Sequence, residues 1–297
     1  MLDEKNAGQP PTKPHTTNMH PIINMLIQLQ ELILIRSEQE AVMSSGRLSQ
    51  LDSAIQALRA NLPPETGQLF QRIEKKDLLV IVPISHNVCT GCGLVLPVSL
   101  VQIVRSGEKL QQCPNCARIL YYQNFLPRRV SKKMGGRFAP RRSGIARFSS
   151  TELMIPSLRA TERDNVIAEL AGRMVEEGFV DNGAKLLDEA LKREAIMHTA
   201  IEYGISFPHV RGVEGGGLTL ALGISRKGIK FDPASRTLSH IIFFIVIPTA
   251  ASVFYLRLLA GLTQSFLKKE ARENLMNSQT PKELWDCLLR TTRSAIK

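Results

Sequence analysis

The sequence contains no apolar run long enough to cross a membrane. The longest one, from Ile241 to Leu256, is interrupted by Pro248 and followed by Arg257, whereas a membrane-spanning helix needs roughly 20 apolar residues. We interpret this run as a buried strand followed by an amphipathic helix. The polar, proline-rich residues 1–19 also lack the apolar segment of a signal peptide. We therefore expect a cytoplasmic protein without a membrane span, which begins with a disordered tail at residues 1–19.

Acidic residues are absent from residues 124–150, in a chain whose formal net charge is +11. This segment is rich in Gly, Pro and Ser and holds eight basic residues, namely Arg128, Arg129, Lys132, Lys133, Arg137, Arg141, Arg142 and Arg147. Its composition predicts a basic linker between two domains. Such a linker attracts a polyanion, which can be RNA, DNA, an anionic membrane or an acidic partner. The alternative is a solvated hinge without a partner, because runs of charge usually only keep a chain in water.

Cysteine is scarce as well, and four of the five cysteines form two Cys-x-x-Cys pairs, Cys89 with Cys92 and Cys113 with Cys116. Each pair can form a tight turn that directs two thiolates at one point, and four protein ligands leave no open coordination position. The spacing therefore predicts a structural Zn²⁺ site, with disulfides or an iron centre as the alternatives. Cys287 lies in a helical segment, and we interpret it as a small buried apolar residue.

Two apolar patterns of helical period precede the first cysteine pair. They predict antiparallel helices at residues 21–43 and 47–62, with the heptad seam of a coiled coil. A short third helix is expected at residues 65–76. We group these helices as a helical hairpin at residues 20–76. So short a hairpin buries little surface by itself, and we expect it to pack on a partner chain or on its neighbouring domain.

The hairpin and the cysteine pairs carry a family resemblance. The motifs that carry it are Cys89-x-x-Cys92-Gly-Leu-Val-Leu-Pro97, Arg105-Ser-Gly-Glu-Lys109 and Cys113-Pro-Asn-Cys116-Ala-Arg-Ile-Leu-Tyr121. Together with the preceding hairpin they resemble the bacterial coiled-coil plus C4-type zinc ribbon family. The resemblance implies a zinc ribbon at residues 77–123 and an interaction module for an unknown partner, without chemistry of its own.

The residues after the linker mix helical and strand patterns. Helices are expected at residues 163–177, 184–193, 250–267 and 281–292, and strands at residues 217–224 and 240–247. Elements of both kinds over residues 151–297 predict an α/β domain with a mixed sheet flanked by helices. The chain is therefore expected to be a multidomain protein.

The most specific stretch of this domain is Gly204-Ile-Ser-Phe-Pro-His209-Val-Arg211. Pro208 cannot continue a strand ladder, so His209 is expected at a strand end. In an extended segment Arg211 projects to the same side as His209, where a guanidinium can neutralise a phosphoryl group on the imidazole. Taken alone, however, a histidine in such a setting is more often structural.

Several flanking motifs, in order and spacing, resemble the enzyme IIA domain of the phosphoenolpyruvate-dependent sugar phosphotransferase system, of the fructose, mannitol and nitrogen-regulatory type. They are Gly178, Leu191-x-Arg193-Glu194, Thr199, Lys227-Gly-Ile-x-Phe-Asp232, the strand His240 to Pro248, and Leu256-x-Leu-Leu-Ala-x-Leu262. The resemblance implies that a histidine-phosphorylated carrier protein passes a phosphoryl group to the neutral imidazole of His209. Arg211 and the Thr199 hydroxyl are the candidate donors to that group.

Three functions are open at this point. The first is a regulatory phosphotransferase-system IIA-type protein that signals through its zinc ribbon and hairpin. The second is an adaptor that is not phosphorylated, supported by Ala200 and Glu202, where the family usually has glycines, and by Tyr255, where a second histidine commonly stands. The third is a transcription or nucleic-acid-associated protein that binds through the ribbon and the basic linker.

Overall fold

The computed structural model describes residues 21–42, 48–107, 109–122, 143–213, 218–248 and 252–296. The expected tail at residues 1–19 and most of the expected linker at residues 124–150 lie outside the described residues. Both therefore stay predictions. Within the described ranges, no helix is long and apolar enough to span a membrane.

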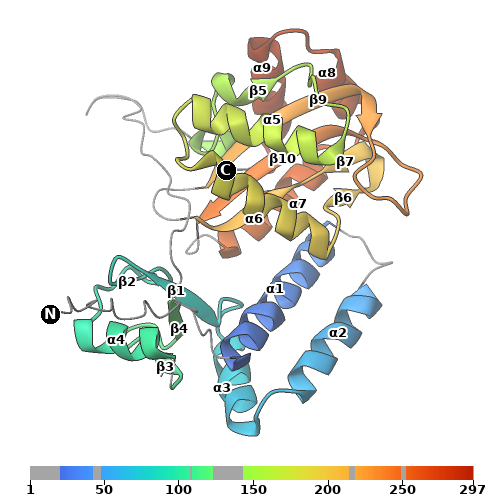
Figure 1. Cartoon of the computed structure of the whole chain (residues 1–297). Coiled ribbons are helices and arrows are strands. Elements are labelled where there is room, and N and C mark those ends of the chain that lie inside the picture. The colour runs from blue at the N-terminus through green and yellow to red at the C-terminus, as the bar shows by residue number, and fades with distance from the viewer. Residues whose placement is uncertain are drawn as a thin grey trace, which may run out of the picture.

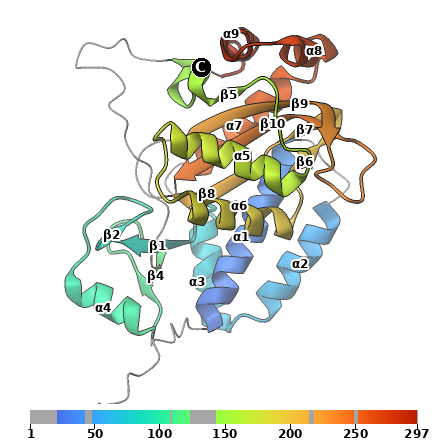
Figure 2. The same cartoon turned by 45° about the horizontal axis from the view of Figure 1, so that its top comes forward.

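Three helices open the described chain: α1 Pro21–Ala41, α2 Leu48–Ala60 and α3 Pro64–Glu74. The helices expected in this part are confirmed. Figures 1 and 2 show α1 and α2 side by side, and Arg36 Nε on α1 lies 2.6 Å from Asp52 Oδ1 on α2. Pro64 occupies the first turn of α3, where the fixed φ of proline suits a helix start. The coiled-coil seam stays a prediction.

The expected zinc ribbon, residues 77–123, contains a small sheet and one helix. Its elements are β1 Ile81–Ser85, β2 Val88–Cys89, α4 Val98–Ser106, β3 Gln111–Gln112 and β4 Ile119–Tyr122. The sheet has the strand order β2-β1-β4-β3, in which β1 and β4 run parallel and the outer pairs are antiparallel. No sequence pattern predicted α4, which is only nine residues long and ends at Gly107 with a φ of 68°.

The C-terminal domain is a six-stranded mixed sheet with helices on both faces, as expected (Figure 2). Its elements are β5 Met154–Ile155, α5 Arg163–Glu176, α6 Gly183–Ile196, β6 Ala200–Ile201, β7 Ile205–Ser206, β8 His209–Val213, β9 Thr219–Ile229, β10 Ser239–Pro248, α7 Ser252–Ser265, α8 Lys269–Asn277 and α9 Pro281–Thr292. The strand order is β5-β9-β10-β7-β6, and β8 also pairs with β10. Strand β10 is the centre of the core, since Ile241 through Ile247 are all at most 1% exposed.

Two features of this domain differ from the sequence expectation. Strand β9 continues to Ile229 rather than ending at Ile224, because Gly228, with a φ of 81°, permits an irregular register opposite β10. Helix α8 was not predicted, since only Leu275 of its nine residues is buried. A helix with a single buried residue leaves no periodic apolar pattern to find.

Helix α1 lies between the zinc ribbon and the C-terminal domain (Figures 1 and 2). Its first half shares a buried cluster with ribbon residues such as Val80 and Ile81. On the same helix, Gln30 Oε1 accepts the backbone N–H groups of Val80 and Ile81 at 2.6 and 2.8 Å. At the other end, Val42 belongs to the core cluster of the C-terminal domain. The hairpin thus packs on its neighbouring domains, one of the two arrangements expected for it.

The packed C-terminal domain begins before Thr151. A 3-10 turn at Gly144–Arg147 precedes it, and Ile145 in that turn is 2% exposed within the domain core. The last residues of the expected linker are therefore part of the fold.

Candidate functional site

The four paired cysteines come together at the end of the ribbon. Their sulfur atoms all lie within 4.8 Å of one another. The Sγ atoms of Cys89 and Cys116 are 3.8 Å apart, and those of Cys92 and Cys113 are 3.6 Å apart. A tetrahedral zinc ion with Zn–S bonds of about 2.3 Å requires sulfurs separated by about 3.8 Å. The arrangement therefore fits a structural Zn²⁺.

The local backbone explains how each pair turns toward that point. Gly93 N–H donates to the Cys89 carbonyl at 2.8 Å, and Ala117 N–H donates to the Cys113 carbonyl at 2.9 Å. Both turning residues have a positive φ, 79° at Gly93 and 58° at Ala117. The two knuckles thus have the same form, although glycine makes the turn without strain and alanine does not. When bound, zinc would supply structural cross-linking of the two knuckles.

The second site is centred on His209, at a break in the sheet. Strands β7 and β8 both pair parallel with β10, β7 at Ile241 and Ile242 and β8 from Ile245 onward. Pro208 stands between the two strands and supplies only its carbonyl, which accepts Ile245 N–H at 3.0 Å. His209 is therefore the first residue of the resumed strand, and it is 1% exposed.

The hydrogen bonds of the His209 ring distinguish its two nitrogens. Nδ1 lies 3.0 Å from the Phe207 carbonyl, and because a carbonyl only accepts, Nδ1 carries the proton. Nε2 lies between a donor and an acceptor, 3.0 Å from Arg193 Nε and 3.1 Å from the carboxylate oxygen Glu38 Oε1. It donates when it pairs with the carboxylate, and it offers its lone pair to Arg193 when that carboxylate is away. Nε2 is therefore the candidate nucleophile, and an arginine faces it.

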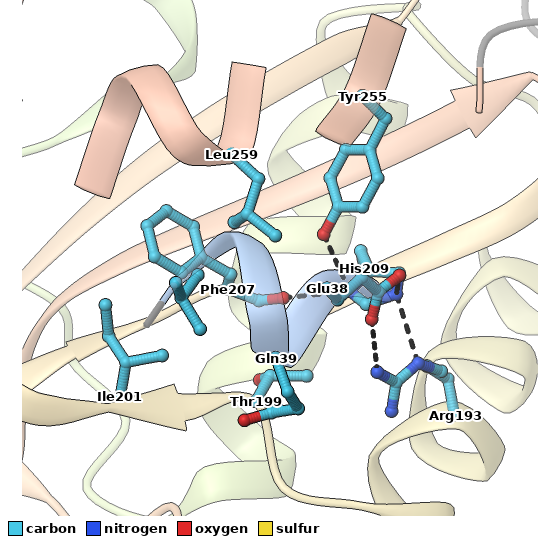
Figure 3. A pocket seen from close by; sticks show the side chains of 10 residues that line it. Glu38, Gln39, Arg193, Thr199, Ile201, Phe207, His209, Tyr255 and Leu259 are labelled. Carbon is cyan, nitrogen blue, oxygen red and sulfur yellow. Dashed lines mark hydrogen bonds and ion pairs between the residues drawn. The ribbon is translucent and has the colours of Figure 1, made fainter. Parts of the chain in front are cut away.

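A carboxylate from a distant part of the chain completes this site. Glu38 of α1 is 3% exposed. Its Oε2 accepts Arg193 Nη2 at 2.7 Å, and its Oε1 accepts Arg211 Nη2 and lies 3.1 Å from His209 Nε2. Figure 3 shows Glu38 above the imidazole, facing the Arg193 guanidinium. Both the predicted residues His209 and Arg211 therefore lie on the same side of β8, in contact with one oxygen of Glu38.

The electrostatics of this cluster favour the ionised carboxylate. Burial raises the pKa of a carboxyl group, but the interactions with His209, Arg211 and Arg193 outweigh burial, so the pKa of Glu38 lies well below its ordinary value. Two guanidinium groups hold one carboxylate. The site is thus a preformed receptor for an anion that touches Nε2.

Thr199, the other predicted donor, lines the same pocket but uses its hydroxyl elsewhere. Its Oγ1–H donates to Glu194 Oε2 at 2.7 Å, and its backbone N–H donates to Glu194 Oε1 at 2.9 Å. This pair fixes the chain between α6 and β6. In the structure Thr199 therefore positions the pocket wall and gives no hydrogen bond to His209.

Three residues departed from the family pattern at the sequence level. The Tyr255 hydroxyl lies 3.3 Å from His209 Nδ1, with the two rings 5.2 Å apart, and burial raises the pKa of this phenol well above its ordinary value. Tyr255 is thus a neutral wall of the pocket, which Arg211 also covers at 5.1 Å from the ring. Glu202 is exposed and Ala200 is half-buried, and neither lines the His209 pocket.

Two contributors to the site, Glu38 and Arg193, were not predicted as site residues. Arg193 belongs to the motif Leu191-x-Arg193-Glu194, but the sequence did not show that it faces His209. Comparison with its neighbour on α6 explains why. The Lys192 side chain is 60% exposed, whereas that of Arg193 is 6% exposed. Only the rotation of α6 on the sheet decides which basic residue faces His209.

Fold and site together define a class of protein: a four-cysteine ribbon joined to an α/β domain with a buried histidine in an anion-binding cluster. Comparison with known families makes this specific. Residues 147–291 match the family described as phosphoenolpyruvate-dependent sugar phosphotransferase system, EIIA 2, and residues 88–120 match the C4-type zinc ribbon domain. The C-terminal half of the chain is an enzyme IIA domain of type 2, and it is joined to a C4-type zinc ribbon. The resemblances to a C4-type zinc ribbon and to an enzyme IIA domain are confirmed, whereas the coiled coil stays a prediction.

Individual relatives match parts of the chain. The PTS system fructose-specific EIIA component of Haloferax volcanii is 27% identical over 144 residues, which are 48% of this chain and 94% of that protein. The crystal structure of nitrogen regulatory protein IIA-Ntr from Neisseria meningitidis, 21% identical, covers 48% of this chain and 98% of its own, with a TM-score of 0.45. CT398 from Chlamydia trachomatis is 32% identical over 26% of this chain and 33% of its own, with a TM-score of 0.25.

Proposed function

We propose that this chain is a regulatory phosphotransferase-system IIA-type protein that accepts a phosphoryl group on His209 and signals through its ribbon and hairpin. The observation that supports it best is the orientation of the His209 ring, whose Nδ1 lies 3.0 Å from the Phe207 carbonyl and whose Nε2 faces Arg193 Nε. Glu38 Oε1, which lies 3.1 Å from Nε2, also binds Arg211, so both guanidinium groups surround the place where a group on Nε2 would lie once Glu38 is displaced. A neutral imidazole nitrogen near two cations suits the acceptance of a phosphoryl group.

The proposed step is a transfer from nitrogen to nitrogen. The lone pair of His209 Nε2 forms a bond to phosphorus, while the P–N bond of the carrier's phosphohistidine breaks and its electron pair returns to the carrier's ring. The proton on Nδ1 stays in place and continues to donate to Phe207. No further co-reactant is needed. The carrier is a histidine-phosphorylated protein, and we propose that the reaction takes place in the cytoplasm.

The two arginines have separate tasks in this step. Arg193 is 6% exposed and is held at the end of α6, where its Nη1 donates to the Met197 carbonyl at 2.9 Å. Arg211 extends from β8 itself. Together they can donate to different oxygens of the phosphoryl group, because a guanidinium offers five N–H donors in a planar fork. The transition state is stabilised mainly by such positioned charge.

The test is incubation of the full chain with phosphoenolpyruvate and the two general phosphotransferase proteins. Acid-labile phosphate is expected on His209, and His209→Ala is expected to abolish it. His198→Ala is the matched control, because His198 contacts Arg163 and Glu194 rather than the cluster, and it should keep the label. Absence of phosphate both on the correctly folded wild-type chain and on a folded Glu38→Gln variant, or phosphate on another residue, contradicts the proposal.

A non-phosphorylated adaptor is the second candidate. The burial of His209 at 1% exposure supports it, since a carrier protein has to reach that ring. Nucleic-acid binding through the ribbon and basic linker depends on residues that mostly lie outside the described ranges, and no structural observation favours it.

A further inference from the structure

The His209 site is closed by the end of helix α1. Glu38, Gln39 and Val42 line its pocket together with residues of the C-terminal domain, and Figure 3 shows the Glu38 side chain of this turn against the imidazole. The remaining space is about 10 Å³, which holds at most about one water molecule. A phosphoryl group cannot enter, and no carrier can reach Nε2, while α1 stays where it is.

The carboxylate of Glu38 stands where a phosphoryl group on Nε2 has to be. One of its oxygens is 3.1 Å from Nε2 and is bound by Arg211, and the other is bound by Arg193 at 2.7 Å. A carboxylate and a phosphoryl group share this chemistry, since both are anions whose oxygens accept charge-assisted hydrogen bonds from guanidinium groups. The same two arginines cannot fully bind both groups at the same time.

We propose that Glu38 occupies the phosphoryl site of His209, so that docking of α1 and phosphorylation of His209 exclude each other. The inference rests on the proposed function and adds its regulation. Docked α1 protects the histidine, and a phosphoryl group on Nε2 displaces Glu38 by competing for Arg193 and Arg211. The phosphorylated state is therefore also the state in which the end of α1 is released.

Other contacts of α1 with the C-terminal domain are consistent with reversible docking. A cavity of about 390 Å³ separates α1 from α6 and β8, lined among others by Gln28, Glu31, Lys192 and Ile196. Beside it, Glu31 reaches Arg193 only at 3.5 Å. The helix is thus incompletely packed along this side. Its last turns are held by packing on α7 and by the buried ionic contacts of Glu38.

The test compares phosphorylation rates of the full-length wild type, Glu38→Gln and Glu40→Gln. Glu38→Gln keeps the shape of the side chain but removes its charge. The fraction of molecules in which α1 is undocked, and with it the initial rate of His209 phosphorylation, should therefore rise at least tenfold. This magnitude follows because a hydrogen bond to a charged group changes an equilibrium by about 10- to 150-fold. Glu40→Gln makes the same charge change two residues away, on a side chain 65% exposed. It should leave the rate unchanged.

The outcomes separate the inference from the proposed function. Equal rates in all three proteins leave phosphorylation standing and overturn the exclusion, and a slower Glu38→Gln also overturns it, because Glu38 would then assist the reaction. If none of the folded proteins is phosphorylated, the proposed function fails and this inference falls with it.

A second measurement tests whether phosphorylation of His209 undocks α1. Hydrogen exchange of the amides in residues 36–41 should quicken at least tenfold when wild-type His209 becomes phosphorylated, while the amides of β10 stay protected. Unchanged protection of α1 in the phosphorylated protein would overturn the inference even if Glu38→Gln were to fold poorly.

Discussion

The ion pair between Glu38 and Arg211 joins two elements that are far apart in the chain, and a double-mutant cycle measures what it contributes. The variants are Glu38→Gln, Arg211→Gln and the double variant, all unphosphorylated. The measured quantity is the free energy that holds α1 on the C-terminal domain, taken from hydrogen exchange of the amides in residues 36–41. The cycle isolates the coupling free energy, which is the part of the docking free energy that requires both side chains.

The structure gives the expected magnitude. The pair is almost wholly removed from water, with side chains 4% and 12% exposed, so solvent screens it little. A hydrogen bond between charged groups of this kind contributes about 1.5–3 kcal/mol, which falls in the lower part of the range measured for close charge pairs across interfaces. The stacking of Arg211 over Tyr255 at 5.1 Å does not depend on Glu38 and cancels in the cycle.

A matched cycle on Arg36 and Asp52 serves as the comparison. That pair joins α1 to α2 at 2.6 Å, but its side chains are 35% and 50% exposed. Exposed ion pairs contribute about 0–1 kcal/mol, so its coupling should be clearly smaller. If the effects of Glu38→Gln and Arg211→Gln add to within about 0.5 kcal/mol, the two residues do not act as a pair and the docking argument is refuted.

Two further predictions concern acid and metal. The docked pKa of Glu38 is lowered, so its contribution to docking is complete above its ordinary value of 4.5 and is lost as the pH falls below it. The difference between wild type and Glu38→Gln in the protection of the α1 amides from hydrogen exchange should therefore stay constant from about pH 7 to 5 and shrink in stronger acid. A difference that already shrinks near pH 6 would contradict this. Removal of zinc by a chelator, or Cys113→Ser, should unfold the ribbon, whose core includes the cysteines, while the C-terminal domain keeps its NMR spectrum; a chelated ribbon with an unchanged spectrum would show that zinc is not structural.

Much of the fold could be predicted because its signals are local. The periods of α2 and α5 mark one buried face each, and the spacing of the cysteine pairs reports the geometry of a metal knuckle. Helix α1 kept a helical period although Ile33, Leu34 and Ile35, on different sides of it, are all buried. The Pro208-His209 pair allowed the strand break to be predicted for the same reason. Proline interrupts the ladder whatever surrounds it, so the strand break and the shared side of His209 and Arg211 follow from neighbours in sequence.

Glu38 could not be predicted, because what buries it is not local. Its partners Arg193 and Arg211 lie 155 and 173 residues further along the chain. In the sequence Arg36-Ser-Glu-Gln-Glu40 it looks no different from Glu40, and glutamates on helices are ordinarily solvated. A buried carboxylate is tolerated only where cations compensate its lost hydration, and those cations are supplied by the packing of α1 against another domain.

The same helix ties the two modules to each other. Gln30 makes three hydrogen bonds to the backbone of Val80 and Ile81, at the start of ribbon strand β1, and Glu38, eight residues later, binds the His209 cluster. At 1.5 Å per residue the two contacts are about 12 Å apart on one continuous α-helix. An α-helix of this length is stiff, so the proposed displacement of Glu38 would either unwind the last turns of α1 or shift the helix against the ribbon. The placement of Gln30 and Glu38 on one helix therefore gives the proposed phosphorylation of His209 a mechanical route to the zinc ribbon.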